Sequence, residues 1–376
     1  MLSLSRTNTN LIGQWWWTID RWILALIIIL VFLGVLLVMA ASPAVAIQHH
    51  WNSFHFIKKH IIFLLPTLPI LIGISFFSLQ NIKLVGLIIL GISLLGLIST
   101  LFIGVEIKGA SRWLDIGGIS VQPSEFIKPS FAVVCAWLIS KQHDSAFFPG
   151  NLMAIGFYLL IVILLLIQPD LGMTGLITVM CFSQFFLAGM PLIWIFSGMG
   201  CGIGGLLGAY FLFPHVSRRV DHFLHSEGGD KFGDRYQINQ SLEAFINGGF
   251  AGQGPGEGTV KKYLPDAHAD FIFAVAGEEF GMILCLLLVG IFAFILLRSF
   301  RRLFDENNMF IVLAVTGLVV QFGLQAVINM ASTLNLMPTK GMTLPFISYG
   351  GSSLIAQAVG MGIVLGLTRR RIGEYD

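Results

Sequence analysis

The chain has 376 residues, of which 56% are hydrophobic, 11% are charged and 42 are glycine. Soluble domains carry roughly 25% charged residues, so this composition excludes an ordinary water-soluble enzyme. The 22 Lys and Arg against 20 Asp and Glu give a formal charge of +2, which argues against a nucleic-acid partner. Several apolar runs approach the ~20 residues that a helix needs to cross a bilayer. The sequence therefore predicts an all-α, polytopic integral membrane protein.

About ten apolar segments follow one another along the chain as candidate transmembrane helices. They lie near residues 22–42, 61–78, 82–104, 126–140, 152–167, 172–189, 191–213, 271–297, 309–331 and 345–367. Residues 15–22 combine tryptophans with Asp20 and Arg21, which is typical of an interfacial anchor rather than a cleaved signal peptide. We expect one membrane domain over residues 1–376, with a large loop, 214–270, between the seventh and eighth spans.

Basic residues predict the orientation of these spans. An even number of spans leaves both termini on one side of the membrane. The basic residues on that side are Arg6, Arg21, Lys83, Lys141, Arg298, Arg301, Arg302, Arg369, Arg370 and Arg371. By the positive-inside rule that side is cytoplasmic, so we expect segments 1–21 and 368–376 inside and loop 214–270 outside. Lys58 and Lys59, in the first outer loop, run against the rule.

Cysteines and histidines show no pattern that is typical of a metal site or a disulfide framework. Cys135, Cys181, Cys201 and Cys285 lie within apolar runs and are expected to be small core residues. His49, His50, His55 and His60 in the first outer loop lack ligand spacing. We assign no protein metal site, although a divalent cation, Mg²⁺ or Mn²⁺, could accompany a phosphorylated substrate.

The first polar cluster lies between the third and fourth spans, on the outer side. It contains segment 108–113 (KGASRW), segment 122–125 (QPSE) and Lys128. The cations Arg112 and Lys128 suit the oxygens of a pyrophosphate. A capped helix start, with Pro123 followed by Glu125 in the first turn, explains the same residues equally well.

A second, shorter cluster is segment 168–172 (QPDLG), between two apolar runs. Its Pro-Asp-Xaa-Gly pattern is typical of a tight turn, which is the favoured role for Asp170. The carboxylate could instead cap the next helix or face a polar cavity, and the sequence does not separate these two alternatives.

The loop 214–270 carries most of the polar chemistry. Tyr236 and Gln237 precede a glycine-rich stretch, 248–258 (GGFAGQGPGEG), and segment 261–270 (KKYLPDAHAD) ends the loop. The glycines permit close backbone approach to a ligand, and their amides could cradle an anion. Their spacing matches neither of the common nucleotide-binding loops.

Asp270 is the favoured general base because it stands directly before the apolar run of the eighth span, where burial would raise a carboxyl pKa. A charge placed against a helix N-terminus is the alternative role, and Asp266 is the competing carboxylate. His268 could shuttle a proton or orient Asp270. Glu278 and Glu279 lie about two turns into the span and are expected to pair with a cation or polar neighbour inside the bundle.

The last cluster leads into the tenth span. It comprises Asn329 and segment 339–353, which is rich in glycine and polar residues. Non-helical backbone at this depth usually lines a cavity enclosed by protein. Lys340 could neutralise a phosphate and Ser348 could donate a hydrogen bond, whereas small-residue helix packing would explain the glycines but not Lys340.

Together, the ordered motifs resemble the SEDS family of shape, elongation, division and sporulation proteins. The resemblance covers nearly the whole chain and rests on segments 108–113, 122–125, 168–170, 254–270 and 338–353. Segment 338–353 (PTKGMTLPFISYGGSS) is most similar to the division branch rather than the elongation branch. The resemblance implies a ten-span peptidoglycan glycosyltransferase of the bacterial inner membrane that polymerises lipid II at the septum. It also implies a class B penicillin-binding protein as transpeptidase partner, and further membrane proteins of the divisome.

The family's Leu-Pro-Xaa-Xaa-His-Xaa-Asp motif matches residues 264–270 and carries its essential aspartate to Asp270. Two positions depart from many relatives: Ala269 stands where threonine is common, and Lys262 where some have glutamate. A scheme with two carboxylates therefore does not fit, and Asp270 alone is expected to deprotonate the 4-hydroxyl of the acceptor GlcNAc. That oxygen would attack C1 of the donor MurNAc with inversion, and undecaprenyl diphosphate would leave.

The remaining site residues are expected to bind substrate or support the site. The candidate substrate contacts are Arg112, Lys128, Lys262, His268, Lys340 and Ser348. The candidate supporting residues are Glu125, Asp170, Gln237, Glu278, Glu279 and Asn329.

Two other functions remain open from the sequence: a lipid II flippase or proton-coupled transporter, and a non-catalytic divisome scaffold. Glu278 and Glu279, taken as intramembrane carboxylates, favour transport. The absence of paired helix-breaking repeats argues against transport.

Overall fold

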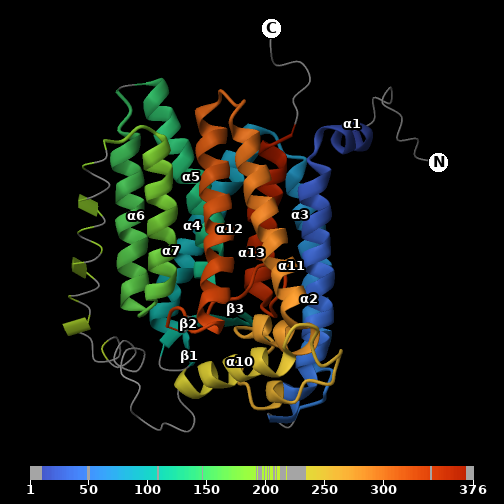
Figure 1. Ribbon diagram of the computed structural model, residues 1–376. Helices are drawn as coiled ribbons and strands as arrows, with labels where there is room; N and C mark the ends of the chain where they lie inside the picture. The colour runs from blue at the N-terminus through green and yellow to red at the C-terminus, as the bar shows by residue number, and fades with distance from the viewer. Residues whose placement is uncertain are drawn as a thin grey trace.

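The computed structural model describes residues 11–48, 51–107, 110–145, 147–191, 234–338 and 341–369, with scattered residues between 193 and 217. Long helices stand side by side as a bundle, with a small sheet and α10 at one end and α1 at the other (Figure 1). The bundle helices are α2 (Arg21–Gln48), α3 (His55–Ser75), α4 (Leu79–Ile103), α5 (Pro123–Asp144), α6 (Gly150–Ile167), α7 (Leu171–Leu187), α11 (Ile272–Leu303), α12 (Met309–Thr333) and α13 (Gly351–Leu367). The elements at the ends are α1 (Leu11–Thr18), β1 (Val105–Ile107), β2 (Ala110–Ile116), β3 (Ile119–Val121), α10 (Asp234–Gly248) and the 3-10 helix η1 (Val260–Lys262).

The membrane character that the composition predicts is confirmed. Within the described residues, the helices long and apolar enough to cross a bilayer are α2, α3, α4, α6, α11 and α12, and α7 and α13 are shorter apolar helices. Each predicted span except 191–213 coincides with one bundle helix. Most of the predicted span 191–213, including Cys201, lies outside the described residues. Cys135, Cys181 and Cys285 are buried free thiols, as expected.

Helix starts follow local capping chemistry. Asn308 accepts hydrogen bonds from the amides of residues 310 and 311 at the start of α12, and Ser78 accepts one at the start of α4. Asp170 does the same for α7, with its carboxylate 3.2 Å from the Met173 amide nitrogen. These side chains satisfy amides that have no partner within the helix. Pro123 at the start of α5 and Glu125 in its first turn confirm the predicted helix start, although the residue before Pro123, Gln122, makes no side-chain capping bond.

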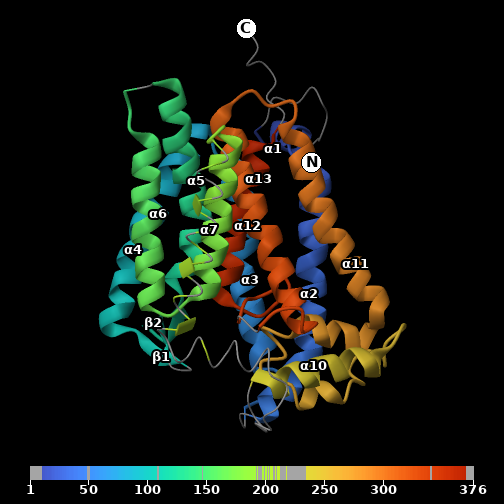
Figure 2. The same ribbon diagram turned by 60° about the vertical axis from the view of Figure 1, so that its left-hand side comes forward.

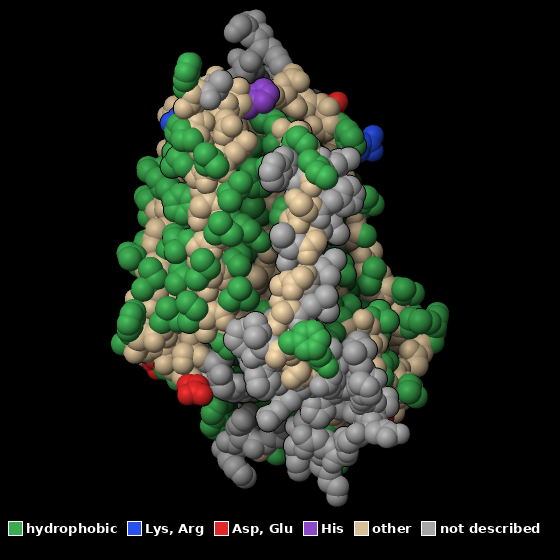
Figure 3. Space-filling view, turned by 90° about the vertical axis from the view of Figure 1, so that its left-hand side faces the viewer, with side chains coloured by type: hydrophobic (Ala, Val, Ile, Leu, Met, Phe, Trp, Pro, Cys, Tyr) green, Lys and Arg blue, Asp and Glu red, His purple; other side chains and the backbone are tan. Residues whose placement is uncertain are grey.

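The bundle has central and peripheral helices. α5, α12 and α13 contact one another and are buried along most of their length, while α4 and α6 lie at the edge (Figures 1 and 2). On α6, Leu152 and Ile167 expose 72% and 59% of their surface. Hydrophobic side chains cover the described part of this side, and charged ones stand near its two ends (Figure 3). Such a band suits contact with lipid tails.

A three-stranded antiparallel sheet joins α4 to α5 and is an addition to the all-α prediction. β2 pairs with both β1 and β3, and the two-residue turn between β2 and β3 consists of Gly117 and Gly118. The sequence did not predict these strands because they are short and lie between two long apolar runs that predict helices. The sheet places Arg112, on β2, at the same end of the bundle as α10 (Figure 1).

Both described ends of the chain lie at the other end of the bundle. α1 and the last turn of α13 lie there (Figure 1), and Arg369 Nε donates to Thr18 Oγ1 at 3.0 Å. Asp20 accepts from Arg298 Nε at 2.8 Å and from Arg302 Nη2 at 3.0 Å. The prediction that the two ends share a side is therefore confirmed for the described residues, and Arg298, Arg302 and Arg369 lie at the same end.

The Asp20 ion pairs make stability depend on pH. Burial acts to raise the pKa of Asp20, but hydrogen bonds from Arg298 and Arg302 outweigh it and hold the pKa below its ordinary value of 3.8. A lowered carboxyl pKa adds stability above the unfolded-state pKa and loses it as the pH falls through the folded-state pKa. We expect the melting temperature of the wild type to fall below about pH 4 more steeply than that of Asp20→Asn. Melting curves in detergent test this, with the exposed Asp305→Asn as control; parallel curves for wild type and Asp20→Asn would contradict it.

Candidate active site around Asp270

Asp270 lies two residues before α11 begins, at the end of the bundle that carries α10 and the sheet (Figure 1). Its side chain is partly exposed, so it combines access to solvent with a largely buried surrounding chain. α11 kinks at Gly281, and the part before the kink lies beside α10 (Figure 2). The span predicted for 271–297 therefore coincides with α11, but a kink at Gly281, which the sequence did not indicate, separates its first turns from the rest.

Three successive carbonyl groups clamp the chain that carries Asp270. The His268 carbonyl accepts from the amide of Tyr349 at 2.9 Å, and the Ala269 carbonyl accepts from Ser348 Oγ at 2.6 Å. The Asp270 carbonyl accepts from Asn329 Nδ2 at 2.9 Å. Because the main chain is held at three consecutive residues, the Asp270 side chain has a defined origin from which to approach a reactant.

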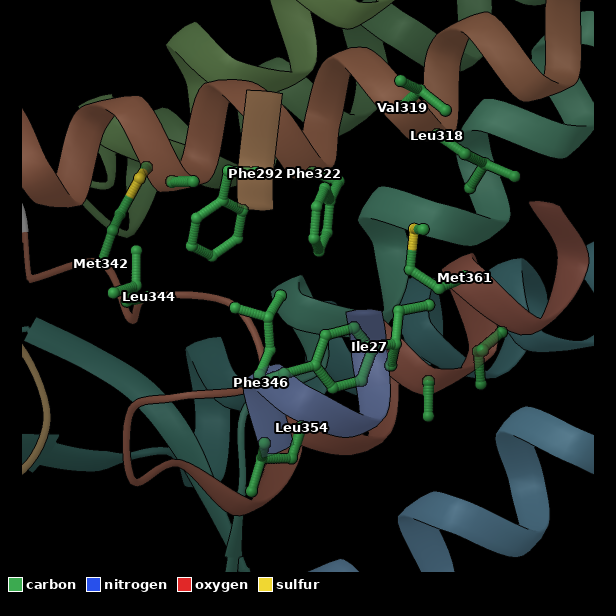
Figure 4. Close-up of a cluster of buried hydrophobic side chains, with 14 of the residues drawn as sticks. Ile27, Phe292, Leu318, Val319, Phe322, Met342, Leu344, Phe346, Leu354 and Met361 are labelled. Atoms are coloured by element: carbon green, nitrogen blue, oxygen red, sulfur yellow. The ribbon is translucent and has the colours of Figure 1, made fainter. Parts of the chain in front are cut away.

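The segment that supplies these donors, 341–350, is non-helical and anchored in the core. Leu344 and Phe346 are buried, and the Phe346 ring lies 6.2 Å from that of Phe322. Both join Phe292 of α11 in one apolar cluster (Figure 4). The tenth span therefore begins at Gly351 rather than at residue 345, and the non-helical approach expected from the sequence is confirmed.

The carboxylate of Asp270 faces the beginning of this segment. A Cβ built on Gly341 would lie 3.5 Å from Asp270 Oδ2. Asn329 Nδ2 also donates to the Met342 carbonyl at 2.6 Å, so one amide ties the Asp270 chain to the same segment. Lys340, the neighbour of Gly341 in sequence, lies outside the described residues.

A buried polar network inside the bundle holds segment 341–350 in place. Lys128 Nζ lies 2.8 Å from Glu125 Oε2 and donates to Gln325 Oε1 at 2.7 Å. Gln325 Nε2 donates to the Thr343 carbonyl at 3.0 Å, and Gln357 Nε2 donates to Gln325 Oε1 at 2.8 Å. Gln325 thus joins α5, α12, α13 and the segment next to Asp270.

Gln325 was not among the residues expected at the site, although its spacing from Asn329 could have indicated it. Gln325 and Asn329 are four residues apart on α12, so they share one helix face. Polar side chains at that spacing in an apolar helix indicate a buried polar contact.

Lys128 is completely buried and its ammonium already contacts two side chains. This geometry suits a supporting role, with Glu125 as its partner, better than direct contact with a diphosphate. Its contact with substrate stays a prediction.

Arg112 fastens the turn between α6 and α7. Its Nε and Nη2 donate to the carbonyls of Gln168 and Pro169 at 3.1 and 2.6 Å, and its Nη1 lies 3.7 Å from Asp170 Oδ2. The structure thus gives Asp170 the capping role, within the expected turn. Arg112 keeps 24% of its side chain exposed, so part of the guanidinium stays accessible.

Glu278 and Glu279 pair as predicted, but with the loop. Glu278 accepts from the backbone amides of Val260 at 2.7 Å and Lys261 at 2.9 Å, and from Asn247 Nδ2 at 2.9 Å. Glu279 forms an ion pair with Lys261 Nζ. Both carboxylates therefore hold η1 against α11, and neither stands alone at mid-membrane.

Part of the glycine-rich stretch packs against protein backbone, a contact that the sequence did not indicate. The amides of Gln253 and Gly254 donate to the carbonyls of Glu278 and Glu279 at 3.0 and 2.9 Å. At Gly252, with φ +85°, an added Cβ would lie 2.2 Å from the Glu279 carbonyl oxygen. The glycines therefore permit close approach to the α11 kink, where Gly281 itself has φ +71°.

The remaining predicted residues lie around this centre. Lys262 is exposed on η1, beside the buried Lys261, and Gln237 is partly buried on α10. Ser348 is buried, and its hydroxyl contacts both the Ala269 carbonyl and the Leu344 amide, so it braces the Asp270 chain.

An aromatic contact that the sequence did not indicate flanks His268. The Phe56 ring, on α3, lies 4.0 Å from the His268 ring, and Tyr349 lies 5.1 Å from it. These rings pack against His268, two residues before Asp270. The two nitrogens of the buried His60 have no hydrogen-bond partner within the described chain.

Metal ligands do not gather here. Among the described residues, His, Cys, Asp and Glu side chains form no group of three or more that could hold an ion. The divalent cation considered from the sequence has no protein cage in this part of the chain.

Known proteins are similar to this chain over nearly its whole length. The model of the FtsW, RodA and SpoVE family, described as "Cell cycle protein", matches residues 20–372. The "Probable peptidoglycan glycosyltransferase FtsW" of Caulobacter vibrioides is 42% identical over 374 residues, covering 99% of this chain and 95% of the relative. That of Tolumonas auensis is 35% identical, covering 92% and 91%.

Solved structures show the same fold. A chain from "Structural coordination of polymerization and crosslinking by a peptidoglycan synthase complex" has a TM-score of 0.76 and 26% identity, covering 93% of this chain and 97% of that one. The rod shape determining protein RodA of Thermus thermophilus has a TM-score of 0.66 and 25% identity, covering 94% and 97%.

Proposed function

The chain belongs to the FtsW, RodA and SpoVE family of cell cycle proteins, the SEDS family that its motifs resemble, and it is a peptidoglycan glycosyltransferase. From this premise we propose that it polymerises lipid II during septal wall synthesis, with Asp270 as the general base. The observation that supports this role most directly is the triple clamp on the carbonyls of residues 268–270. It positions one partly exposed carboxylate at the outer end of the bundle.

The chemistry is a single displacement at a sugar carbon. Asp270 accepts the proton of the GlcNAc 4-hydroxyl as that oxygen forms a bond to C1 of the donor MurNAc. The bond from C1 to the diphosphate oxygen breaks, its electron pair leaves with undecaprenyl diphosphate, and C1 is inverted. A correctly placed base of this kind typically contributes 10²–10⁴-fold in rate.

The departing diphosphate needs positive charge nearby. Lys262 is exposed on η1, and Arg112 keeps part of its guanidinium accessible beside the sheet. Lys340 is a third candidate by its place in sequence next to Gly341. Lys128 acts in this scheme by holding Gln325 and hence segment 341–350.

The partner we propose is a class B penicillin-binding protein, which would cross-link the strands that this chain polymerises. A solved relative described in terms of coordinated polymerisation and crosslinking by a synthase complex supports it. Arg298 and Arg302 pair with Asp20 at the end that carries α1, so we place that end and both termini in the cytoplasm of a bacterial inner membrane. Asp270 then faces outward, at the septum with other divisome proteins.

Transport is the competing function. Glu278 accepts hydrogen bonds from the amides of Val260 and Lys261, and Glu279 forms an ion pair with Lys261, so both carboxylates have partners in the loop, which favours a supporting role over a proton relay.

We expect purified protein, with a class B partner, to convert labelled lipid II into glycan strands resolved on a gel. Omission of the partner measures how far activity depends on it. If an intact complex made no polymer but moved labelled lipid II across vesicle membranes, transport would replace polymerisation as the function. If it did neither, the chain would be a scaffold.

A further inference from the structure

A cavity lined by both charged and apolar side chains opens at the end of the bundle opposite Asp270. It has a volume of about 540 Å³ and lies where α1 and α2 meet the last turns of α11. Trp17, Asp20, Trp22, Arg298 and Arg302 are among the residues that line it. The glycosyltransferase reaction uses none of them.

Some guanidinium nitrogens that line the cavity do not take part in the ion pairs with Asp20. Asp20 is buried and accepts from Arg298 only through Nε, at 2.8 and 2.9 Å, while Arg302 uses Nε and Nη2, at 3.1 and 3.0 Å. Within the described part of the chain, Nη1 and Nη2 of Arg298 and Nη1 of Arg302 have no acceptor. The two guanidinium side chains remain 29% and 28% exposed.

The charges that line the cavity are unbalanced. Arg21, Arg298 and Arg302 provide three positive charges against the single negative charge of Asp20, which leaves a net charge of +2. Asp20 also fixes two guanidinium groups side by side on α11, four residues apart. A pair of oriented guanidinium groups is well suited to a phosphate.

The surroundings of the cavity are those of a lipid interface. Trp22 is 63% exposed, and the Arg21 guanidinium lies 5.0 Å from the Trp17 ring centroid. Tryptophan and arginine are typical of the headgroup level of a membrane. From Trp22 an exposed apolar face continues along α2 through Ile29 and Phe32, which are 43% and 61% exposed.

We propose that this cavity binds the headgroup of an anionic phospholipid. Its phosphate lies against the outer nitrogens of Arg298 and Arg302, and its acyl chains lie along the exposed face of α2. The site lies at the opposite end of the molecule from Asp270, so it is separate from the site for the lipid-linked substrate. A bound lipid would join α2 to α11, the helix that directly follows Asp270.

The test measures lipid binding by the full chain in neutral detergent. We expect native mass spectrometry to show retained phosphatidylglycerol but not phosphatidylcholine, and phosphatidylglycerol alone to raise the melting temperature. Arg298→Gln should weaken phosphatidylglycerol binding about tenfold, because it removes a charged hydrogen-bond donor. Arg301→Gln, which removes the same charge from an exposed position outside the cavity, should leave binding unchanged.

A second variant separates loss of the site from loss of folding. Ala25 lines the cavity and is exposed, so Ala25→Phe should obstruct it while leaving the Asp20 pairs intact. We expect this variant to melt like the wild type without lipid and to lose the stabilisation by phosphatidylglycerol.

Three results would overturn the proposal. Equal binding of the two phospholipids would remove the headgroup specificity, and equal effects of Arg298→Gln and Arg301→Gln would remove the site. Stabilisation by millimolar glycerol phosphate or inorganic phosphate to the same extent as by phosphatidylglycerol would make the ligand a soluble anion rather than a lipid.

Discussion

Asp270→Asn is expected to reduce the rate of glycan polymerisation by about 10²–10⁴-fold, the usual contribution of a general base. Asparagine has nearly the same shape and leaves the three carbonyl clamps in place, because these involve main-chain atoms of residues 268–270. It cannot accept the hydroxyl proton. Initial rates of strand formation from labelled lipid II, with the same class B partner and equal amounts of folded protein, provide the measurement.

Asp266→Asn is the matched control. Asp266 lies in the same turn, with φ +52°, a conformation that asparagine tolerates well. We expect this variant to keep activity near that of the wild type. Full activity of Asp270→Asn would disprove the base assignment, and loss of activity in Asp266→Asn alone would transfer the role to Asp266.

Lys128→Met is expected to destabilise the fold by about 3–5 kcal/mol, because it leaves the Glu125 carboxylate buried without its cation. Lys128 is 0% exposed and Glu125 is 6% exposed. The change also deprives Gln325 of a donor, and Gln325 holds segment 341–350 through Thr343. Urea or thermal unfolding in detergent measures the loss of stability, and polymerisation should decline with it.

The double variant Glu125→Gln/Lys128→Met separates the charge from the fold. With both charges removed, no unpaired ion remains in the interior, so much of the stability should return. Equal destabilisation of the single and double variants would show that the cost comes from packing or from Gln325 rather than from the unpaired carboxylate.

Asp270→Asn and Lys128→Met act on two parts of the same site, the reactive carboxylate and the buried polar network that supports it. Asp270 supplies the reactive group, and Asn329 connects its main chain to segment 341–350. Beneath that segment, Gln325 joins α12 to α5 and α13. Phe346 adds an apolar anchor in the core (Figure 4). The site is therefore supported from the centre of the bundle, although it lies at its end.

The loop before α11 is supported in a second way. Glu278 caps η1, and the glycine-rich stretch lies directly on the α11 kink at Gly281. Both contacts hold the loop that leads to Asp270 against α11. Their effect on function is exerted through the position of Asp270, since neither supplies a reacting group.

The sequence by itself determined the membrane class, the approximate spans, the shared side of the two chain ends and the family. These properties follow from local composition: a run of about 20 apolar residues is a strong pattern by itself, and ordered motifs survive without knowledge of contacts. It also determined the start of α5 at Pro123 and the turn at Asp170, because helix starts and turns depend on neighbouring residues.

Only the tertiary structure decided what the polar residues contact. Lys128, Glu278 and Gly252 could each have faced a ligand, and the structure shows protein contacts for all three. The partners of Glu278 lie 17, 18 and 31 residues away in sequence, and Gln325 lies 197 residues from Lys128, so no local pattern records these contacts; the pair of Lys128 with Glu125, three residues apart, is the local exception. The physical reason is that a buried charge or amide has to find a partner, and folding, not spacing, determines which one comes within reach.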